Sequence, residues 1–187
     1  MQIKRIFLLA ALFLVALLEI RQLFHSSSLR LNKQIEVTPE ATTTAVIITG
    51  EIATVAFAID GDTVELTDGR RVRYIGIDAP ETAHEGKSAE CFGNEAREEN
   101  SKRTNGKKVR LEKDISETDG YGRLLRYVYA DQPARAGAPL INEQLVKDGF
   151  ARAWNVPPDE KYKDALLVLQ QEAREARRGL WELCRSR

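Results

Sequence analysis

The 187-residue chain has no surplus of charge of either sign, because 28 Lys and Arg residues balance 28 Asp and Glu residues. A protein that coats nucleic acid owes its affinity to massed positive charge, so that class is excluded. Two His and two Cys residues are too few for most zinc nucleases and for tetrahedral structural zinc sites. Long repeats and low-complexity blocks are also absent. The chain does contain 43% hydrophobic residues, enough to bury the core of one domain.

The zero net charge is an average over two unlike parts. Residues 1–30 carry four basic side chains and one acidic side chain, so the rest of the chain is slightly acidic. Any nucleic-acid chemistry in the body of the chain must therefore depend on a local site rather than on overall charge.

Only one long apolar run occurs, and it lies near the N-terminus. Thirteen apolar residues, Ile6–Leu18, follow the short basic segment Met1–Arg5. This length is short for a membrane span and typical of the hydrophobic region of a signal peptide. A buried amphipathic helix would show polar residues at a spacing of 3.6, which this run lacks. The pattern therefore predicts export.

Cleavage of the export segment remains open, because no small-x-small site follows the run directly. Further apolar residues as far as Phe24 extend the segment. We expect residues 1–24 to be a signal peptide or an uncleaved anchor that holds residues 6–24 in the membrane. Residues 25–44 are Ser/Thr-rich without an apolar period, which predicts a flexible linker before a folded domain at 45–187.

The folded domain reads as strands followed by helices. Apolar or alternating segments predict five strands, at 45–59, 63–67, 70–77, 108–113 and 124–130. Helical periodicity appears at 93–105, 139–148 and 159–178, with Gly149 and Gly179 as C-caps of the last two. The first of these helices is very polar, so its buried face must be narrow. The pattern predicts an α+β domain: a five-stranded OB-type β-barrel with about three helices.

Two carboxylates stand at the ends of predicted strands. Asp62 lies in the turn DGDT, and Asp78 ends the third strand just before Ala79. Pro80 keeps Ala79 extended, so that its carbonyl can project. If the hairpin brings both carboxylates together, they form a hard-oxygen site for Ca²⁺ or Mg²⁺. Asp62 taken alone is more simply interpreted as a turn-former.

Arginines accompany these carboxylates. Arg73 precedes Asp78 by five residues, and Arg123 lies in the loop DGYGR. Strict alternation would place Arg73 and Asp78 on opposite faces, so they share a site only if the strand ends or bends near Gly76. Each arginine taken singly fits a solvated surface charge. Two carboxylates, two arginines and the loop residue Glu81 are nevertheless what hydrolysis of a phosphodiester requires.

The strings AIDGDTVEL, VRYIGIDAPET and TDGYGRLLRYVYA, together with LINEQLVKDGFARA and RGLWELC, occur in order along residues 48–184. In this order and spacing they resemble the staphylococcal nuclease-like (thermonuclease) family. The resemblance implies an OB-type barrel with a Ca²⁺-dependent nuclease site. By matched position, Asp62, Asp78 and the main-chain carbonyl of Ala79 would bind calcium, which offsets the repulsion between carboxylates and an anionic substrate.

The resemblance also implies roles for the substrate-facing residues. Arg73 and Arg123 would hold the scissile phosphate and the charge that develops in the transition state. Glu81 would activate or position the attacking water, and Tyr121 would help to hold a terminal phosphate. The implied enzyme cleaves DNA and/or RNA to 3′-phosphate ends and is a monomer without a protein partner. The alternatives are a catalytically silent OB-fold module that binds single strands and a membrane-anchored interaction domain.

Cys91 and Cys184 form an even pair in a chain with an export signal. Two free buried thiols would be the cytosolic alternative. Export favours a disulfide that ties the loop after Glu81 to the C-terminal end. Trp154 is a candidate for base stacking, with a core or rim position as the alternative. His84 is interpreted as a loop histidine without a set role.

Overall fold

The computed structural model describes residues 50–130 and 137–184, all within the unit Ala45–Arg187. The predicted export segment (1–24) and linker (25–44) lie outside the described residues. No helix in the described part of the chain is long and apolar enough to cross a membrane.

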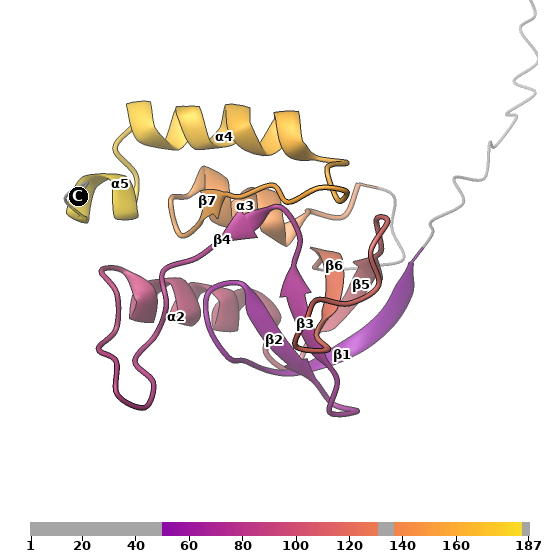
Figure 1. Cartoon of the computed structure of the whole chain (residues 1–187). Helices are drawn as coiled ribbons and strands as arrows, with labels where there is room; N and C mark the ends of the chain where they lie inside the picture. The colour runs from indigo at the N-terminus through magenta and orange to yellow at the C-terminus, as the bar shows by residue number, and fades with distance from the viewer. Residues whose placement is uncertain (1–49, 131–136, 185–187) are drawn as a thin grey trace, which may run out of the picture. The chain divides into compact units, whose positions relative to one another are not determined.

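Five strands close into a barrel (Figure 1). They are β1 (Glu51–Ala58), β2 (Thr63–Leu66), β3 (Arg71–Tyr74), β5 (Lys108–Glu112) and β6 (Leu124–Tyr129). Neighbours follow the order β1-β2-β3-β6-β5, and β5 pairs back with β1. The β3–β6 pair is parallel, whereas every other neighbouring pair in the barrel is antiparallel. The prediction of a five-stranded OB-type barrel is confirmed, and β2, β5 and β6 have bounds close to the predicted ones.

Alternation along the short strands builds the core. Val64 and Leu66 on β2 point inward and are almost fully buried, whereas Glu65 between them is only half-buried. On β3, Val72 and Tyr74 are buried in the same way. Because the interior is filled by these side chains, the polar residues of interest lie where the strands end.

The predicted third strand, residues 70–77, divides at Gly76. β3 ends before this glycine, and β4 (Ile77–Asp78) then pairs with β7 (Arg152–Ala153) in a separate two-stranded sheet. Gly76 has a φ of 78°, a conformation that favours glycine because it has no Cβ. The bend therefore breaks the alternation that would have placed Arg73 and Asp78 on opposite faces.

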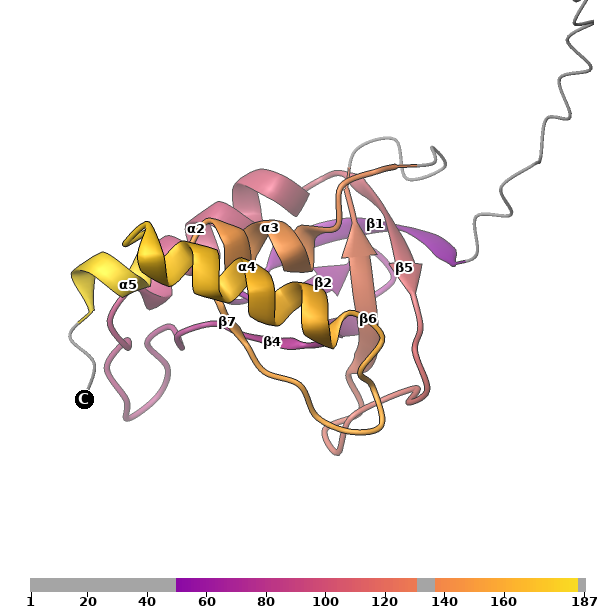
Figure 2. The same ribbon diagram turned by 90° about the horizontal axis from the view of Figure 1, so that it is seen from above.

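Three longer helices pack against the barrel and against one another (Figures 1 and 2). They are α2 (Gly93–Thr104), α3 (Ile141–Lys147) and α4 (Lys163–Glu175), and a short α5 (Leu180–Leu183) follows. α2 contacts β1 and α3, α3 contacts β6 and α4, and α4 contacts β7. The expectation of about three helices is confirmed.

Two details of the predicted helices are wrong. The predicted helix at 159–178 begins later, because the carboxylate of Asp159 instead accepts hydrogen bonds from the backbone N–H groups of Ile115 and Ser116. It also ends earlier, so Gly179 precedes α5 rather than capping α4. Gly149, with a φ of 79°, does follow the end of α3.

The buried face of α2 is narrow and partly polar. Its buried residues are Gly93, Ala96, Asn100 and Thr104. The Asn100 side chain accepts a hydrogen bond from the Tyr74 hydroxyl at 2.9 Å and donates one to the backbone oxygen of Asp60 at 2.9 Å. This buried amide is therefore satisfied, and it fixes the turn between β1 and β2.

A disulfide joins Cys91, in the loop before α2, to Cys184, which directly follows α5. It ties the segment after β4 to the C-terminal end of the described chain. The pairing favoured from the sequence is therefore present in the structure.

Candidate active site

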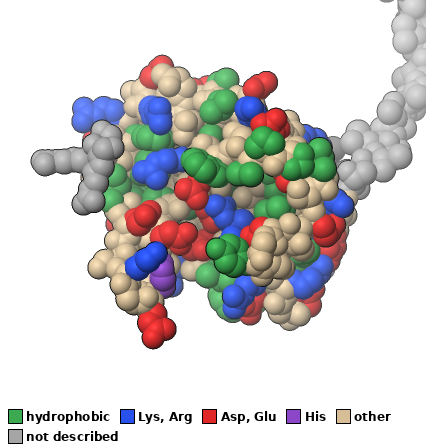
Figure 3. Space-filling model, viewed as in Figure 1, with side chains coloured by type: hydrophobic (Ala, Val, Ile, Leu, Met, Phe, Trp, Pro, Cys, Tyr) green, Lys and Arg blue, Asp and Glu red, His purple; other side chains and the backbone are tan. Residues whose placement is uncertain are grey.

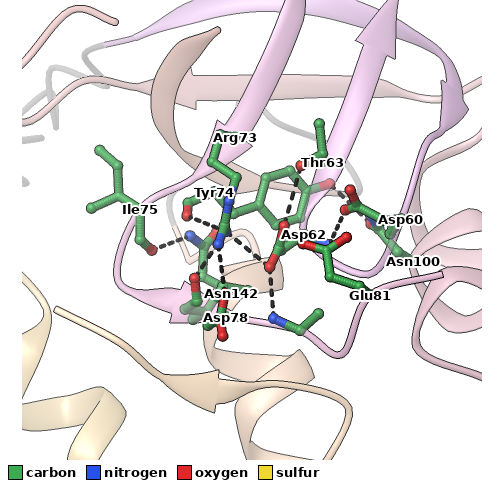
Figure 4. Close-up of polar contacts among 12 residues, drawn as sticks. Asp60, Asp62, Thr63, Arg73, Tyr74, Ile75, Asp78, Glu81, Asn100 and Asn142 are labelled. Carbon is green, nitrogen blue, oxygen red and sulfur yellow. Dashed lines mark hydrogen bonds and ion pairs between the residues drawn. The ribbon is translucent and has the colours of Figure 1, made fainter. Parts of the chain in front are cut away.

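Arg73 lies at the centre of the site, between two carboxylates (Figure 4). Its Nη1 atom lies 2.9 Å from Oδ2 of Asp62, and its Nη2 atom lies 3.0 Å from Oδ1 of Asp78. Nη1 also donates to the backbone oxygen of Ile77 at 2.9 Å. Asp62 and Asp78 are thus brought together across one guanidinium, and the bend at Gly76 makes this possible.

The Asp62 carboxylate has several hydrogen-bond partners besides Arg73. Its Oδ2 atom accepts the backbone N–H of Ala79 at 2.6 Å, and its Oδ1 atom accepts the hydroxyl of Thr63 at 3.2 Å. The residue is 4% exposed. Burial raises the pKa of the Asp62 carboxyl, Arg73 opposes the shift, and the negative charge of Asp60 adds to it. An additional cation nearby would favour the ionised form of this buried acid.

Glu81 lies beside this pair, in the loop that follows β4. Figure 4 places its carboxylate near Asp62 and Asp60. Partial burial raises the pKa of Glu81, the charge of Asp60 adds to the shift, and Arg73 opposes it. Figure 3 shows acidic side chains gathered in the middle of this face, with basic side chains next to them. Two carboxylates thus contact Arg73 and two more, those of Glu81 and Asp60, lie beside Asp62, so the site is rich in negative charge.

A calcium ion fits the chemistry of these donors. Asp62, Asp78 and the carbonyl of Ala79 offer oxygen atoms alone, which suit Ca²⁺ or Mg²⁺ rather than zinc. The Asp78 side chain is 44% exposed, so the site opens to solvent on that side. Among residues 50–130 and 137–184, no group of three or more His, Cys, Asp or Glu side chains forms a ready-made metal site. Water and substrate oxygens would have to complete the coordination.

Arg123 and Tyr121 lie in the loop before β6. The Nε atom of Arg123 donates to Oδ2 of Asp119 at 2.7 Å, and its guanidinium lies 5.4 Å from the centre of the Tyr121 ring. Tyr121 is 88% exposed. The partners given for Arg123 are therefore Asp119 and Tyr121, not Asp62 or Asp78. β6 pairs in parallel with β3, with Leu125 opposite Arg73. The predicted residues thus form two groups.

Sequence reasoning missed Asp60 and Asp119. Asp60 accepts the backbone N–H of Asp62 through Oδ1 at 2.9 Å, and Asp119 accepts the backbone N–H of Arg123 in the same way at 3.0 Å. Burial works against the charge of Asp119, but hydrogen bonds from Arg123 and Tyr121 keep its pKa below the usual value. An aspartate just before a glycine in a tight turn was the available signal.

A hollow of about 320 Å³ adjoins Arg73. Its lining includes Asp119, Leu125, Trp154, Val156 and Pro157. Trp154 is 61% exposed and lies at the rim of this hollow rather than in the core. His84 is exposed, and its ring nitrogen Nδ1 lies 3.2 Å from the carbonyl of Thr82 within its own loop.

The fold and this cluster define a class: OB-type barrels that present an arginine between carboxylates. Comparison with known proteins then identifies the family. Residues 71–183 match the family model described as "Staphylococcal nuclease homologue". The chain is 37% identical to a thermonuclease of Staphylococcus intermedius over 138 residues. These residues cover 72% of this chain and 79% of that protein.

Two further relatives agree. A thermonuclease of Staphylococcus hyicus is 36% identical over 126 residues, which cover 66% of this chain and 71% of that protein. Endonuclease YncB of Bacillus subtilis (strain 168) is 36% identical over 129 residues, which cover 66% of this chain and 58% of that protein. The chain therefore belongs to the staphylococcal nuclease family, as its motifs predicted, and is a nuclease of that family.

Proposed function

We propose that the protein is an exported or membrane-tethered, calcium-dependent nuclease that hydrolyses phosphodiester bonds of DNA and/or RNA and leaves 3′-phosphate ends. The observation that carries the proposal is the placement of Arg73 between Asp62 and Asp78, with Glu81 beside them. Family membership supplies the reaction class. The acidic surroundings explain how a chain without net positive charge handles a polyanion, since calcium would supply the missing charge.

Arg73 is suited to the phosphate because it already presents two donor nitrogens from one rigid plane. A phosphate oxygen that enters the site would compete with Asp78, the more exposed of its two partners. When bound, calcium would polarise the phosphoryl oxygen and neutralise the carboxylates. Arg73 would then stabilise the charge that grows on the equatorial oxygens as water attacks phosphorus.

Glu81 is the residue suited to the attacking water. Its raised pKa lies closer to neutral pH than that of an ordinary glutamate, and a carboxylate with a higher pKa is a stronger base. We infer that a Glu81 carboxylate oxygen takes one proton of the water as the water oxygen bonds to phosphorus. The bond from phosphorus to the 5′-oxygen then breaks, and the 5′-oxygen takes a proton from solvent. The 3′-oxygen keeps the phosphate, which gives a 3′-phosphate end.

Arg123 and Tyr121 would act on the substrate from the neighbouring loop. Asp119 holds the Arg123 guanidinium through Nε, which leaves the terminal nitrogens available for phosphate oxygens. Tyr121 is exposed enough to meet a terminal phosphate directly. Both residues would therefore bind substrate without a rearrangement of the barrel.

The disulfide supports the proposed location. Disulfides persist in oxidising compartments and are rare in the cytosol, so the Cys91–Cys184 bridge agrees with export. Residues 6–24 would provide the signal or anchor, and a monomer without a protein partner would be sufficient for the chemistry.

The proposal is tested with the purified chain, incubated with single- and double-stranded DNA and RNA in calcium or in a calcium chelator. We expect cleavage only with calcium, and products that a polymerase extends only after phosphatase treatment. Products extended directly would contradict the 3′-phosphate assignment. Binding without cleavage of any substrate would favour a catalytically silent OB-fold module that binds single strands.

A further inference from the structure

Glu90 closes the loop that carries Glu81. The backbone N–H of Glu90 donates to the carbonyl of Glu81 at 2.9 Å, and the backbone N–H of Glu81 donates to Oε2 of Glu90 at 3.2 Å. Both backbone groups of Glu81 are therefore bound to one residue nine positions further along the chain. The path of the chain at Glu81 depends on where Glu90 is held.

The start of α2 supports the same point. A Cβ on Gly93 would lie 2.2 Å from the carbonyl oxygen of Glu81, so the two backbones are in direct contact. Phe92 has a φ of 72°, and its ring stacks on Phe150 with 5.4 Å between ring centres. The segment from Glu90 to Gly93 thus forms a support segment, which packs against the backbone of Glu81.

The disulfide attaches this support segment to a buried part of the molecule. Cys91 lies within the support segment, and its partner Cys184 follows α5. Leu180 of α5 is 1% exposed, and its backbone N–H donates to the carbonyl of Gly149 at 2.9 Å. The covalent bond therefore connects the loop that carries Glu81 to an anchored helix.

We propose that Glu90 is a positioning residue for Glu81 and that the Cys91–Cys184 disulfide holds Glu90 in place, so that turnover depends on the oxidation state of the bridge. The inference rests on the proposed nuclease function. Reduction by a dithiol such as dithiothreitol transfers two electrons and two protons, which gives two cysteine thiols and a cyclic oxidised dithiol. The loop that carries Glu81 would then no longer be bonded covalently to the segment after α5.

The kinetic test compares the oxidised full-length chain, the reduced and alkylated chain, and single variants at Glu90. Glu90→Ala should lower kcat about 10- to 100-fold with KM unchanged, because small misplacements of a catalytic group have effects of this order. Glu90→Gln should recover most of the rate, because an amide oxygen still accepts the Glu81 N–H. Glu85→Ala is the matched control, since Glu85 is an exposed carboxylate of the same loop.

Reduction of the wild type should lower kcat in the same direction, reoxidation should restore it, and reduction of Glu90→Ala should add little. Equal rates for Glu90→Ala and Glu85→Ala would overturn the role of Glu90. A Glu90→Gln variant as slow as Glu90→Ala would show that charge, not position, matters. Unchanged kcat after reduction would overturn the role of the disulfide.

A second measurement does not depend on activity. Hydrogen exchange of the Glu81 backbone amide should accelerate on reduction and in Glu90→Ala, and in Glu90→Ala the amides of the barrel strands should keep their protection. Unchanged exchange at Glu81 would overturn the proposal even in a chain that cleaves no substrate. Absence of cleavage by the oxidised wild type, with the expected exchange, would refute the nuclease function and leave the structural link intact.

Discussion

The Nη1 atom of Arg73 lies 2.9 Å from Oδ2 of Asp62, and both side chains are largely withdrawn from solvent. Such a pair serves two purposes at once. It neutralises a buried carboxylate, and it fixes a guanidinium at the place where a phosphate would bind. Stability and catalysis are therefore coupled at this pair.

Arg73→Ala is expected to affect both properties. Loss of the arginine leaves Asp62 buried without a counter-ion, so the free energy of unfolding should fall by about 3–5 kcal/mol. Turnover should fall at least ~10²-fold. Denaturant unfolding and kcat measure the two effects. The double variant Asp62→Asn/Arg73→Ala should recover most of the stability and none of the activity; a double variant as unstable as Arg73→Ala would contradict the coupling.

Arg123→Ala is expected to separate activity from stability. The Arg123 side chain is 28% exposed in a loop, and a partly exposed ion pair of this kind contributes about 0–1 kcal/mol. Turnover should nevertheless fall ~10²–10³-fold through loss of one transition-state donor. Arg71→Ala, which removes an arginine exposed to 61%, is the control. Near-wild-type kcat in a folded Arg123→Ala protein would refute the assignment.

Asp159 is expected to make the free energy of unfolding depend on pH in the acidic range. Burial opposes its charge, but hydrogen bonds from the side chain and backbone N–H of Ser116 and from the backbone N–H of Ile115 keep its pKa below the usual value. A carboxyl whose pKa is lowered by folding stabilises the native state above its unfolded pKa of about 3.9, and this contribution is lost as pH falls through the folded pKa. Asp159→Asn should therefore cost about 1–2 kcal/mol at pH 7 and progressively less below pH ~4.

Unfolding of wild type and Asp159→Asn across this pH range checks the sign. Asp164→Asn, which changes an exposed aspartate at the start of α4, serves as the control. A difference between wild type and Asp159→Asn that grows as pH falls would contradict the prediction.

Removal of the disulfide should destabilise the fold strongly. The two cysteines are 93 positions apart, and a loop of this length corresponds to about 4–5 kcal/mol in the chain-entropy model. Cys91→Ser/Cys184→Ser should therefore lower Tm clearly, and reduction should raise the intact mass of the wild type by two hydrogens. Titration of two free thiols in the native protein would show that the bridge does not form.

The barrel could be predicted because each strand carries a local signal. Asp68-Gly69 marks the hairpin between β2 and β3, and alternation marks the inward residues Val64 and Val72. The motifs also named the candidate site residues. Their distances could not be predicted from alternation alone, because the meeting of Arg73 with Asp78 depends on one glycine bend.

Other features depend on contacts that no local pattern specifies. Asn100 is a polar residue in a polar helix, and only the packing of α2 on the turn of Asp60 makes it a buried anchor. The late start of α4 follows from a bond between Asp159 and a loop more than 40 residues earlier in the chain. Glu90, likewise, is an exposed loop residue whose contact with Glu81, nine positions earlier, has no local sequence signal.

The central claim, that carboxylates beside Arg73 bind the calcium needed for cleavage, is tested most directly by the calcium dependence of the rate. Cleavage of a single-stranded DNA should be measured across a calcium titration for the wild type and for Asp78→Asn. Asp78 is 44% exposed, so this variant should keep its fold. We predict no cleavage in a chelator and a much higher calcium requirement for Asp78→Asn. Equal rates in calcium and in chelator, or identical calcium curves for both proteins, would contradict the account.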